Sequence, residues 1–310
     1  MASPAHADRP SPSTAPAALF EGDFLKKLEY LSLVSRRVFR GKILAQRRTK
    51  QLGGGIEFAD HRHYVPGDDF RYIDWNVFAR HDELLLKRFQ EEEDLHVYVL
   101  LDCSRSMAFG RPSKYDYARQ VVAALAYVAL ADLDRVSVSA FAADVVAEFP
   151  LTRGKSRILS LLKFLERVPP QGSLTDLGRV VQSFIHRSSG RRKGLVILVS
   201  DLFDPNGFER GLDLLRHHKY EPHVVQIFDL SEASPVIKGD VELYDVETES
   251  VRKVTVTERN LRQYKQIFEA YLERVKHYCS TYAITMNRTT TDVPFDELIL
   301  RMMRATGGVA

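Results

Sequence analysis

Cysteine is scarce in this sequence, since only Cys103 and Cys279 occur among its 310 residues. Two cysteines so far apart do not make the disulfide framework of small secreted domains, so we expect a reducing compartment, the cytoplasm. Long apolar runs are also missing. The longest, at 121–131, has 11 residues, fewer than the ~20 needed to cross a bilayer. No apolar segment follows a basic start either, as a secretory signal would require.

Several enzyme signatures are absent as well. The glycines at 53–55 lack the spacing and the lysine of a nucleotide-binding P-loop, so any ATP-driven work must come from another protein. No GxSxG motif surrounds Ser104 or Ser106, as an α/β-hydrolase nucleophile would require. Two pairs of nearby histidines lack the further ligands that zinc needs. These pairs are His61 with His63 and His217 with His218.

The chain does contain enough apolar material for a large core. Apolar residues make up 45% of it, and 310 residues exceed one average domain, so we expect one large domain with an appendage. Residues 1–18, rich in proline, alanine and serine, cannot bury enough apolar surface to order, and we expect a disordered tail there. Residues 19–93 are then an N-terminal helix with a signature segment, and residues 94–306 the large domain.

Strand and helix patterns alternate through the large domain. Continuous apolar runs at 96–101 and 194–200 are typical of strands buried on both faces, and a long apolar helix is expected at 115–131. The other expected elements are strands at 135–141, 145–149, 223–228 and 282–287, helices at 155–167, 177–186, 208–218, 261–278 and 294–304, and a two-stranded excursion at 241–257. This alternation predicts an α/β fold, a doubly wound, mainly parallel sheet with helices on both faces.

The motif most informative about chemistry follows the strand at 96–101. Asp102, Ser104 and Ser106 present one carboxylate and two hydroxyls, the hard oxygen ligands that Mg²⁺ and Mn²⁺ prefer. In open α/β sheets, ligands bind at the carboxyl edge, where this loop is expected. We therefore predict a divalent-cation site at an exposed rim of the sheet. The alternative is a serine-rich turn that merely caps the next helix.

Two later residues have positions that complete such a site. Thr175 leads into the helix at 177–186, and Asp201 ends the strand at 194–200. Each alone fits a helix cap. Their occurrence after Asp102, in this order and again at strand or helix ends, favours one shared site.

With these residues the large domain resembles the von Willebrand factor A domain and its metal-ion-dependent adhesion site. The resemblance implies that Asp102, Ser104 and Ser106 are ligands from the first loop, Thr175 from the second and Asp201 from the third. It also implies that the bound Mg²⁺ or Mn²⁺ keeps an open position, which a carboxylate of a partner protein fills.

A second signature lies upstream. It contains the glycines at 53–55 and the stretches Glu57-Phe58-Ala59-Asp60, Pro66-Gly67-Asp68-Asp69 and Ile73-Asp74-Trp75-Asn76. This segment resembles the bacterial family known as domain of unknown function fifty-eight, whose members pair it with a von Willebrand A-like domain. Genes of that family often lie beside MoxR-type ATPases of the AAA+ class. The resemblance implies such an ATPase as a partner. Together with the predicted metal site and the missing enzyme signatures, it leads us to expect a non-catalytic, metal-dependent protein-binding module that acts as an adaptor for that ATPase.

The signature segment itself carries closely spaced charges of both signs. We expect a turn at Pro66-Gly67, because proline presets one turn dihedral and glycine accepts a positive one. We also expect ion pairs that fasten the segment onto the large domain, with Trp75 as a buried anchor. The charged residues concerned are Asp60, Arg62, Arg71, Asp74 and Arg80. The alternative is that they form a partner-binding surface.

Two other functions stay open. A metal-assisted phosphohydrolase would use Asp102 as its nucleophile, but such enzymes typically place a second aspartate two residues later, where this chain has Ser104. A nucleic-acid-binding protein would use the basic segment at 36–50 on phosphates. A net charge of only +3 and the lack of aromatic residues between the basic ones argue against it.

Overall fold

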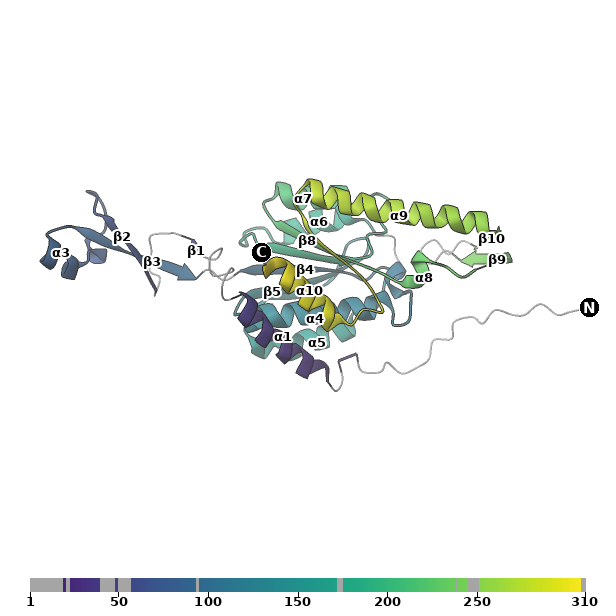
Figure 1. Ribbon diagram of the computed structural model, residues 1–310, viewed down its shortest axis with the longest axis horizontal. Coiled ribbons are helices and arrows are strands. Elements are labelled where there is room, and N and C mark those ends of the chain that lie inside the picture. The colour runs from purple at the N-terminus through teal and green to yellow at the C-terminus, as the bar shows by residue number, and fades with distance from the viewer. Residues whose placement is uncertain are drawn as a thin grey trace, which may run out of the picture.

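The computed structural model describes residues 19–20, 23–39, 48–49, 57–92, 95–171, 175–237, 239–244 and 251–307. Its centre is a six-stranded sheet in the order β11-β8-β7-β4-β5-β6 (Figure 1). The strands are β4 (His96–Asp102), β5 (Arg135–Phe141), β6 (Val145–Arg153), β7 (Leu195–Ser200), β8 (Glu221–Phe228) and β11 (Thr285–Thr290). Every neighbouring pair is parallel except β5 with β6. The predicted α/β fold with a mainly parallel sheet is confirmed.

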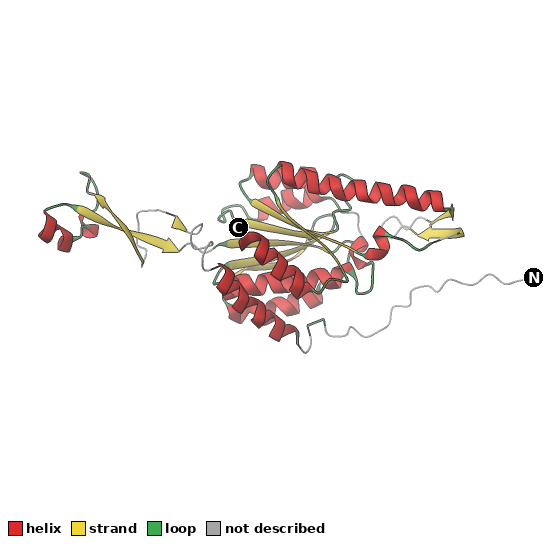
Figure 2. Cartoon of the chain, in the orientation of Figure 1, coloured by secondary structure: helices red, strands yellow, loops and turns green. Residues whose placement is uncertain are grey.

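Helices cover both faces of this sheet (Figure 2). One face carries α1 (Phe24–Phe39), α4 (Lys114–Ala131), α5 (Ile158–Arg167) and α10 (Phe295–Gly307), and the other carries α6 (Leu177–Arg187), α7 (Glu209–His217) and α9 (Glu258–Thr281). Successive side chains of a strand point to opposite faces. In β4, Val99 and Leu101 therefore join the first core, whereas Tyr98 and Leu100 join the second. This explains the continuous apolar run of β4.

Most elements begin within a few residues of their expected positions, and three differ in instructive ways. β11 begins at Thr285, later than expected, because α9 runs on to Thr281 and Ala283 turns the chain with a φ of 53°. β6 continues to Arg153 as the antiparallel edge strand beside β5. The expected helix at 155–167 starts with a 3₁₀ turn, η3 (Lys155–Arg157), before α5.

Both cysteines are free and buried. The Cys103 Sγ donates to the Phe141 carbonyl oxygen at 3.0 Å, and burial raises the pKa of this thiol to about 12. Such a thiol is neutral at ordinary pH and unreactive. Cys103 therefore points inward as a small core side chain, as predicted.

Between β8 and α9 the chain makes the expected two-stranded excursion. It consists of α8 (Leu230–Ala233) and the antiparallel pair β9 (Gly239–Tyr244) and β10 (Val251–Val256). The Asp229 side chain and the Glu232 side chain form a capping box at the start of α8. This short helix follows the carboxyl end of β8, so it stands at the edge of the sheet where the candidate ligands were predicted.

The signature segment forms a small sheet of its own, in the order β1-β3-β2. Its elements are β1 (Arg48–Thr49), β2 (Glu57–His63), the 3₁₀ turn η1 (Phe70–Tyr72), α3 (Trp75–His81) and β3 (Leu85–Glu92). Figure 1 shows β2, α3 and β3 apart from the six-stranded sheet. The predicted turn is present, because Gly67 has a φ of 107° and the Asp68 N–H donates to the Val65 carbonyl oxygen at 3.0 Å.

The ion pairs of this segment connect its own residues, so the predicted network to the large domain is wrong. Arg62 binds Asp68 at 2.6 Å, and Arg71 binds Asp69 at 2.6 Å while its side chain is 78% exposed. Asp74 accepts from His61 at 3.0 Å and caps α3 through the N–H groups of Asn76 and Val77. Asp60 and Arg80 are exposed. Neighbours within the turn and the hairpin pair with Arg62, Arg71 and Asp74, since short loops hold these residues close together.

The prediction that Trp75 is a buried anchor is also wrong. Trp75 is 59% exposed and makes an edge contact with Phe78, with ring centroids 6.1 Å apart. It starts α3, a helix of 7 residues in which no side chain is buried. Phe70 and Val65 are exposed nearby in the sequence, at 69% and 56%.

Fluorescence tests this placement, because Trp75 is the only tryptophan. Excited selectively over tyrosine, the native protein should emit at long wavelength, and acrylamide should quench it almost as efficiently as it quenches the unfolded chain. Trp75→Phe should remove the signal without changing the unfolding temperature, because an exposed ring contributes little core burial. A blue-shifted, protected emission would show instead that Trp75 is covered.

Within the described ranges, no helix is long and apolar enough to span a membrane. Several features predicted from the sequence lie outside those ranges. They are the tail at 1–18, residues 40–47 of the basic segment, the glycines at 53–55 and residues 172–174 before Thr175.

Candidate functional site

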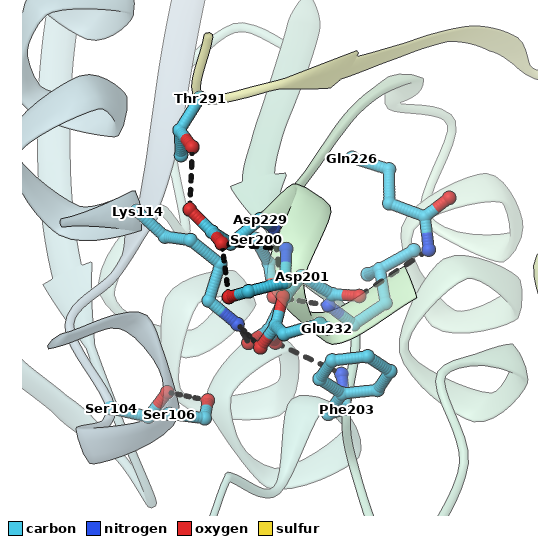
Figure 3. A network of polar contacts seen from close by, with 12 residues as sticks. Ser104, Ser106, Lys114, Ser200, Asp201, Phe203, Gln226, Asp229, Glu232 and Thr291 are labelled. Carbon is cyan, nitrogen blue, oxygen red and sulfur yellow. Dashed lines mark hydrogen bonds and ion pairs between the residues drawn. The ribbon is translucent and has the colours of Figure 1, made fainter. Parts of the chain in front are cut away.

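The first loop of the site follows β4. Asp102 ends that strand with no exposed surface, and one carboxylate oxygen accepts from the Ser104 N–H at 2.9 Å. The other accepts from the Ser200 hydroxyl at 2.5 Å. The hydroxyl oxygens of Ser104 and Ser106 lie 3.1 Å apart (Figure 3). One carboxylate and two hydroxyls therefore stand together at the carboxyl end of the central strand, as the sequence predicted.

The third loop is adjacent because β7 pairs with β4. Leu101 is in register with Val199, so Ser200 lies beside Asp102 and Asp201 follows at the same edge of the sheet. The Asp201 side chain is 1% exposed and accepts from the Phe203 N–H at 3.0 Å. It does not cap a helix, because α7 begins later, at Glu209. The helix-cap interpretation of Asp201 is wrong.

Two buried carboxyl groups side by side make this edge electrostatically unusual. Burial and, second to it, the negative charge of Asp201 raise the pKa of Asp102, hydrogen bonds from Ser200 and Ser104 lower it, and the result is a pKa of about 7. A carboxylate in this position favours a proton or a cation as its neighbour.

Thr175 lies between the first and third loops. On one side of it, the Gln171 N–H donates to the Cys103 carbonyl oxygen at 2.6 Å. On the other side, the Leu177 N–H donates to the Asp204 carboxylate at 2.7 Å. Asp176, and not Thr175, caps α6. The segment that contains Thr175 is thus tied to the loops after β4 and β7.

The hydroxyl of Thr175 is the clearest sign of a missing ligand. Its side chain is 3% exposed, and its Oγ1 is buried without a hydrogen-bond partner in the described part of the chain. Leaving a buried hydroxyl unsatisfied costs about 1 to 3 kcal/mol. Such an atom is expected where a bound group completes its contacts.

The site also contains a residue that sequence reasoning missed. Lys114, the first residue of α4, has no exposed surface. Its ammonium lies 2.7 Å from a carboxylate oxygen of Asp201 and 2.5 Å from one of Glu232, and 5.2 Å from the centroid of the Phe203 ring (Figure 3). Lysine in the first turn of a helix is normally solvated, so the sequence had no signal for its burial.

Asp229 is a third acidic residue at the same edge, and its position directly after a buried strand was a sequence signal for it. Asp229 directly follows the buried strand β8, just as Asp102 ends β4 and Asp201 follows β7. It accepts from the Ser231 N–H at 2.9 Å and from the Thr291 hydroxyl at 2.8 Å. The Gln226 amide donates to the Asp201 carbonyl oxygen at 3.3 Å and links β8 to the third loop.

The prediction of an exposed rim is wrong. Asp102 and Ser104 have no exposed surface, and Thr175 and Asp201 are nearly as buried, so only Ser106 among the five is partly exposed. The Gln171 N–H binds the Cys103 carbonyl oxygen of the first loop, and the ammonium of Lys114 bridges the third loop to α8.

The donor set fits a hard divalent cation. Three hydroxyls and two carboxylates are oxygen ligands, and the residues that supply them are Asp102, Ser104, Ser106, Thr175 and Asp201. No group of three or more His, Cys, Asp or Glu side chains in the described ranges has a metal-binding arrangement. A cation at this edge must therefore rely on the hydroxyls.

Comparisons with known proteins agree on the family. The model of the family described as "Protein of unknown function DUF58" matches residues 60–274. Uncharacterized proteins of Mycobacterium tuberculosis and Mycobacterium bovis are each 26% identical over 208 residues, which make up 66% of this chain and 65% of theirs. The match thus spans slightly less than two thirds of the length of these relatives.

Three solved structures show a weaker likeness. An aerotolerance-related membrane protein from Bacteroides fragilis is 17% identical, with a TM-score of 0.45 over 67% of this chain and 98% of that one. The conserved hypothetical protein BatB from Bacteroides thetaiotaomicron is 16% identical, with a TM-score of 0.42 over the same shares. A von Willebrand factor type A structure from Catenulispora acidiphila is 15% identical, with a TM-score of 0.42 over 69% of this chain and 43% of that one.

Proposed function

The chain belongs to the DUF58 family, and we propose that it is a non-catalytic protein-binding module whose binding depends on a divalent cation. The observation that carries this proposal is the buried hydroxyl of Thr175 between the first and third loops, which has no hydrogen-bond partner among the described residues. The paired carboxyl groups of Asp102 and Asp201 support it, because a cation would relieve their mutual repulsion.

The residues that would hold Mg²⁺ or Mn²⁺ are the five predicted from the sequence. We propose that the hydroxyls of Ser104, Ser106 and Thr175 bind the cation directly and that Asp102 and Asp201 neutralise part of its charge. When bound, the cation supplies an electrophilic centre for a carboxylate. Ser106, the most accessible of the five, would then lie closest to the incoming group.

We propose a partner of the MoxR type, an AAA+ ATPase, or the target of that ATPase. The partner would offer a carboxylate to the cation. Since the glycines at 53–55 do not match a P-loop, ATP hydrolysis would come from the partner. Such a pair would work in the cytoplasm, where ATP is available.

Phosphohydrolysis is the second candidate, and the surroundings of Asp102 argue against it. A nucleophile needs a free oxygen that reaches the substrate. Both oxygens of Asp102 accept hydrogen bonds, and the residue has no exposed surface. Ser104 occupies the position of the acid and base. Magnesium-dependent phosphatase turnover that Asp102→Asn abolishes would replace the proposed function with this one.

Removing single hydroxyls tests the proposed function. We expect Ser104→Ala and Thr175→Ala to fold normally, to bind Mg²⁺ at least roughly tenfold more weakly, and to lose the partner, because the freed carboxylates would repel its carboxylate. Calorimetry with Mg²⁺, and then with the candidate ATPase in magnesium or in EDTA, measures both effects. Ser139→Ala is the matched control, since Ser139 is a buried serine in the middle of β5. Equal partner affinity in magnesium and EDTA would mean that the metal site is not the interface.

A further inference from the structure

Lys114 is the least expected residue of the site. It has no exposed surface, and lysine is almost never fully buried unless it is paired. It is also the first residue of α4, where the helix dipole disfavours a cation. Two ion pairs hold its ammonium, with Asp201 at 2.7 Å and Glu232 at 2.5 Å.

The ammonium connects a candidate metal ligand to a residue outside the metal site. Asp201 belongs to the third loop, whereas Glu232 is in α8, 118 residues from Lys114 in the sequence. Glu232 is held in turn, because its second carboxylate oxygen accepts from the Asp229 N–H at 2.9 Å. Tyr264 of α9 donates to the Glu232 carbonyl oxygen at 2.8 Å. The positive charge therefore has a fixed place beside Asp201.

A count of charges shows what this ammonium does. When ionised, Asp102, Asp201, Asp229 and Glu232 carry four negative charges at this edge, and Lys114 carries one positive charge. One divalent cation then leaves the site with one negative charge. Without the ammonium, the same cation leaves two negative charges, which repel an incoming carboxylate more strongly.

We infer that Lys114 is a built-in counter-ion that weakens divalent-cation binding by Asp201 and lessens the repulsion between the loaded site and an anion. The inference rests on the proposed function, because it assigns a role within the same site. Lys114 is a specificity-determining residue in this scheme and touches neither the cation nor the partner. Its ammonium neutralises part of the negative charge that would otherwise attract the cation.

Glu232 offers a substitution of the opposite sign. Glu232→Gln keeps the shape and removes one negative charge, so the charge of Lys114 acts more strongly on Asp201 and on any cation beside it. Lys114→Met removes the positive charge while the methionine fills much of the lysine volume. The double variant K114M/E232Q has the local charge of the wild type. Replacing a buried ion pair with neutral side chains of similar volume is often tolerated by a fold.

Manganese titration of the full chain tests the inference. We expect K114M to bind Mn²⁺ roughly tenfold or more tightly than wild type, E232Q to bind it more weakly, and the double variant to lie near wild type. Electron paramagnetic resonance of free Mn²⁺ gives the affinities, and circular dichroism checks the fold. If K114M does not fold, the other two variants still test the inference. A lower Mn²⁺ affinity of E232Q, together with a wild-type affinity of the double variant, would support it equally.

The outcomes separate the inference from the proposed function. Equal Mn²⁺ affinities for the wild type and all three variants would overturn the role of Lys114. The proposed metal site would not be affected by that result. Binding by K114M but not by wild type would support the inference. No binding by any of the four proteins at millimolar Mn²⁺ would overturn the metal site, and the role of Lys114 with it.

Discussion

Asp102→Asn is expected to stabilise the metal-free protein above pH 7 and to abolish its stabilisation by magnesium. Burial, and then the charge of Asp201, raise the pKa of Asp102 to about 7 in the folded protein, whereas an unfolded aspartate titrates near ~3.9. The folded state thus binds this proton more tightly than the unfolded state. The contribution of the Asp102 proton to stability is therefore complete below about pH 4 and is lost as the pH rises toward 7. The loss amounts to roughly 4 kcal/mol at most.

Asparagine removes this loss because it does not ionise. Its oxygen still accepts from the Ser104 N–H, and its amide donates to the Ser200 hydroxyl, which turns to accept. Magnesium should stabilise wild type by about 2.7 kcal/mol at a hundredfold excess over its Kd, and should leave the variant unchanged. Urea unfolding across the pH range, with magnesium and with EDTA, measures both effects.

Asp229→Asn is the matched control and should show the opposite sign. Burial raises the pKa of Asp229, but hydrogen bonds from Ser231 and Thr291 outweigh it and lower the pKa overall. Its contribution to stability is therefore present at neutral pH and is lost as the pH falls through the lowered pKa. Asp229→Asn should destabilise the protein at neutral pH. If Asp102→Asn destabilises it equally there, the assigned environment of Asp102 is wrong.

Gly211→Ala is expected to destabilise the protein by about 2 to 3 kcal/mol and to weaken magnesium binding. An added Cβ would lie 2.5 Å from the Leu177 Cγ and 3.1 Å from the Leu177 carbonyl oxygen. Leu177 begins α6, and its N–H is bound to Asp204, so it has little freedom to move. Displacing it would shift Thr175, two residues earlier, out of its place between the loops.

Gly178→Ala, at the same contact between α6 and α7, is the control for this prediction. There the added Cβ would meet only the Arg210 side chain, with the Cδ at 3.0 Å, and that flexible chain can move aside. Alanine is a better helix former than glycine by up to ~1 kcal/mol, so Gly178→Ala should be neutral or slightly stabilising. Urea midpoints and Mn²⁺ affinities of both variants provide the test. Equal midpoints for the two alanine variants would contradict the packing seen at Gly211.

Local patterns were sufficient for the elements that build the sheet. The apolar run of β4 predicted a strand buried on both faces, because alternate side chains need an apolar partner on each face. The same reasoning placed Asp102 and Asp201 at one edge, since parallel neighbouring strands end on the same side. The predicted limits of β11 and β6 were wrong for different reasons. The end of α9 decides where β11 begins, and pairing with β5 decides how far β6 extends. Hydrophobic periodicity records neither.

Burial and pairing of charges needed the tertiary structure. Trp75 lies in an apolar stretch yet is exposed, and α3, which it begins, has no buried side chain. Arg71 found its partner two residues away, in Asp69, and not in the large domain. Both the exposure of Trp75 and the pairing of Arg71 depend on how the signature segment folds into its own small sheet.

The sequence by itself determined the α/β fold, the edge at which the site lies and the oxygen ligands it offers, because these follow from the order of strands and from residue chemistry. Only the tertiary structure decided that the site is buried and that Lys114 is inside it. The ammonium of Lys114 meets Asp201 and Glu232, which are 87 and 118 residues away in the sequence. Contacts over such separations depend on the packing of α4, β7 and α8 together, and no local pattern records them.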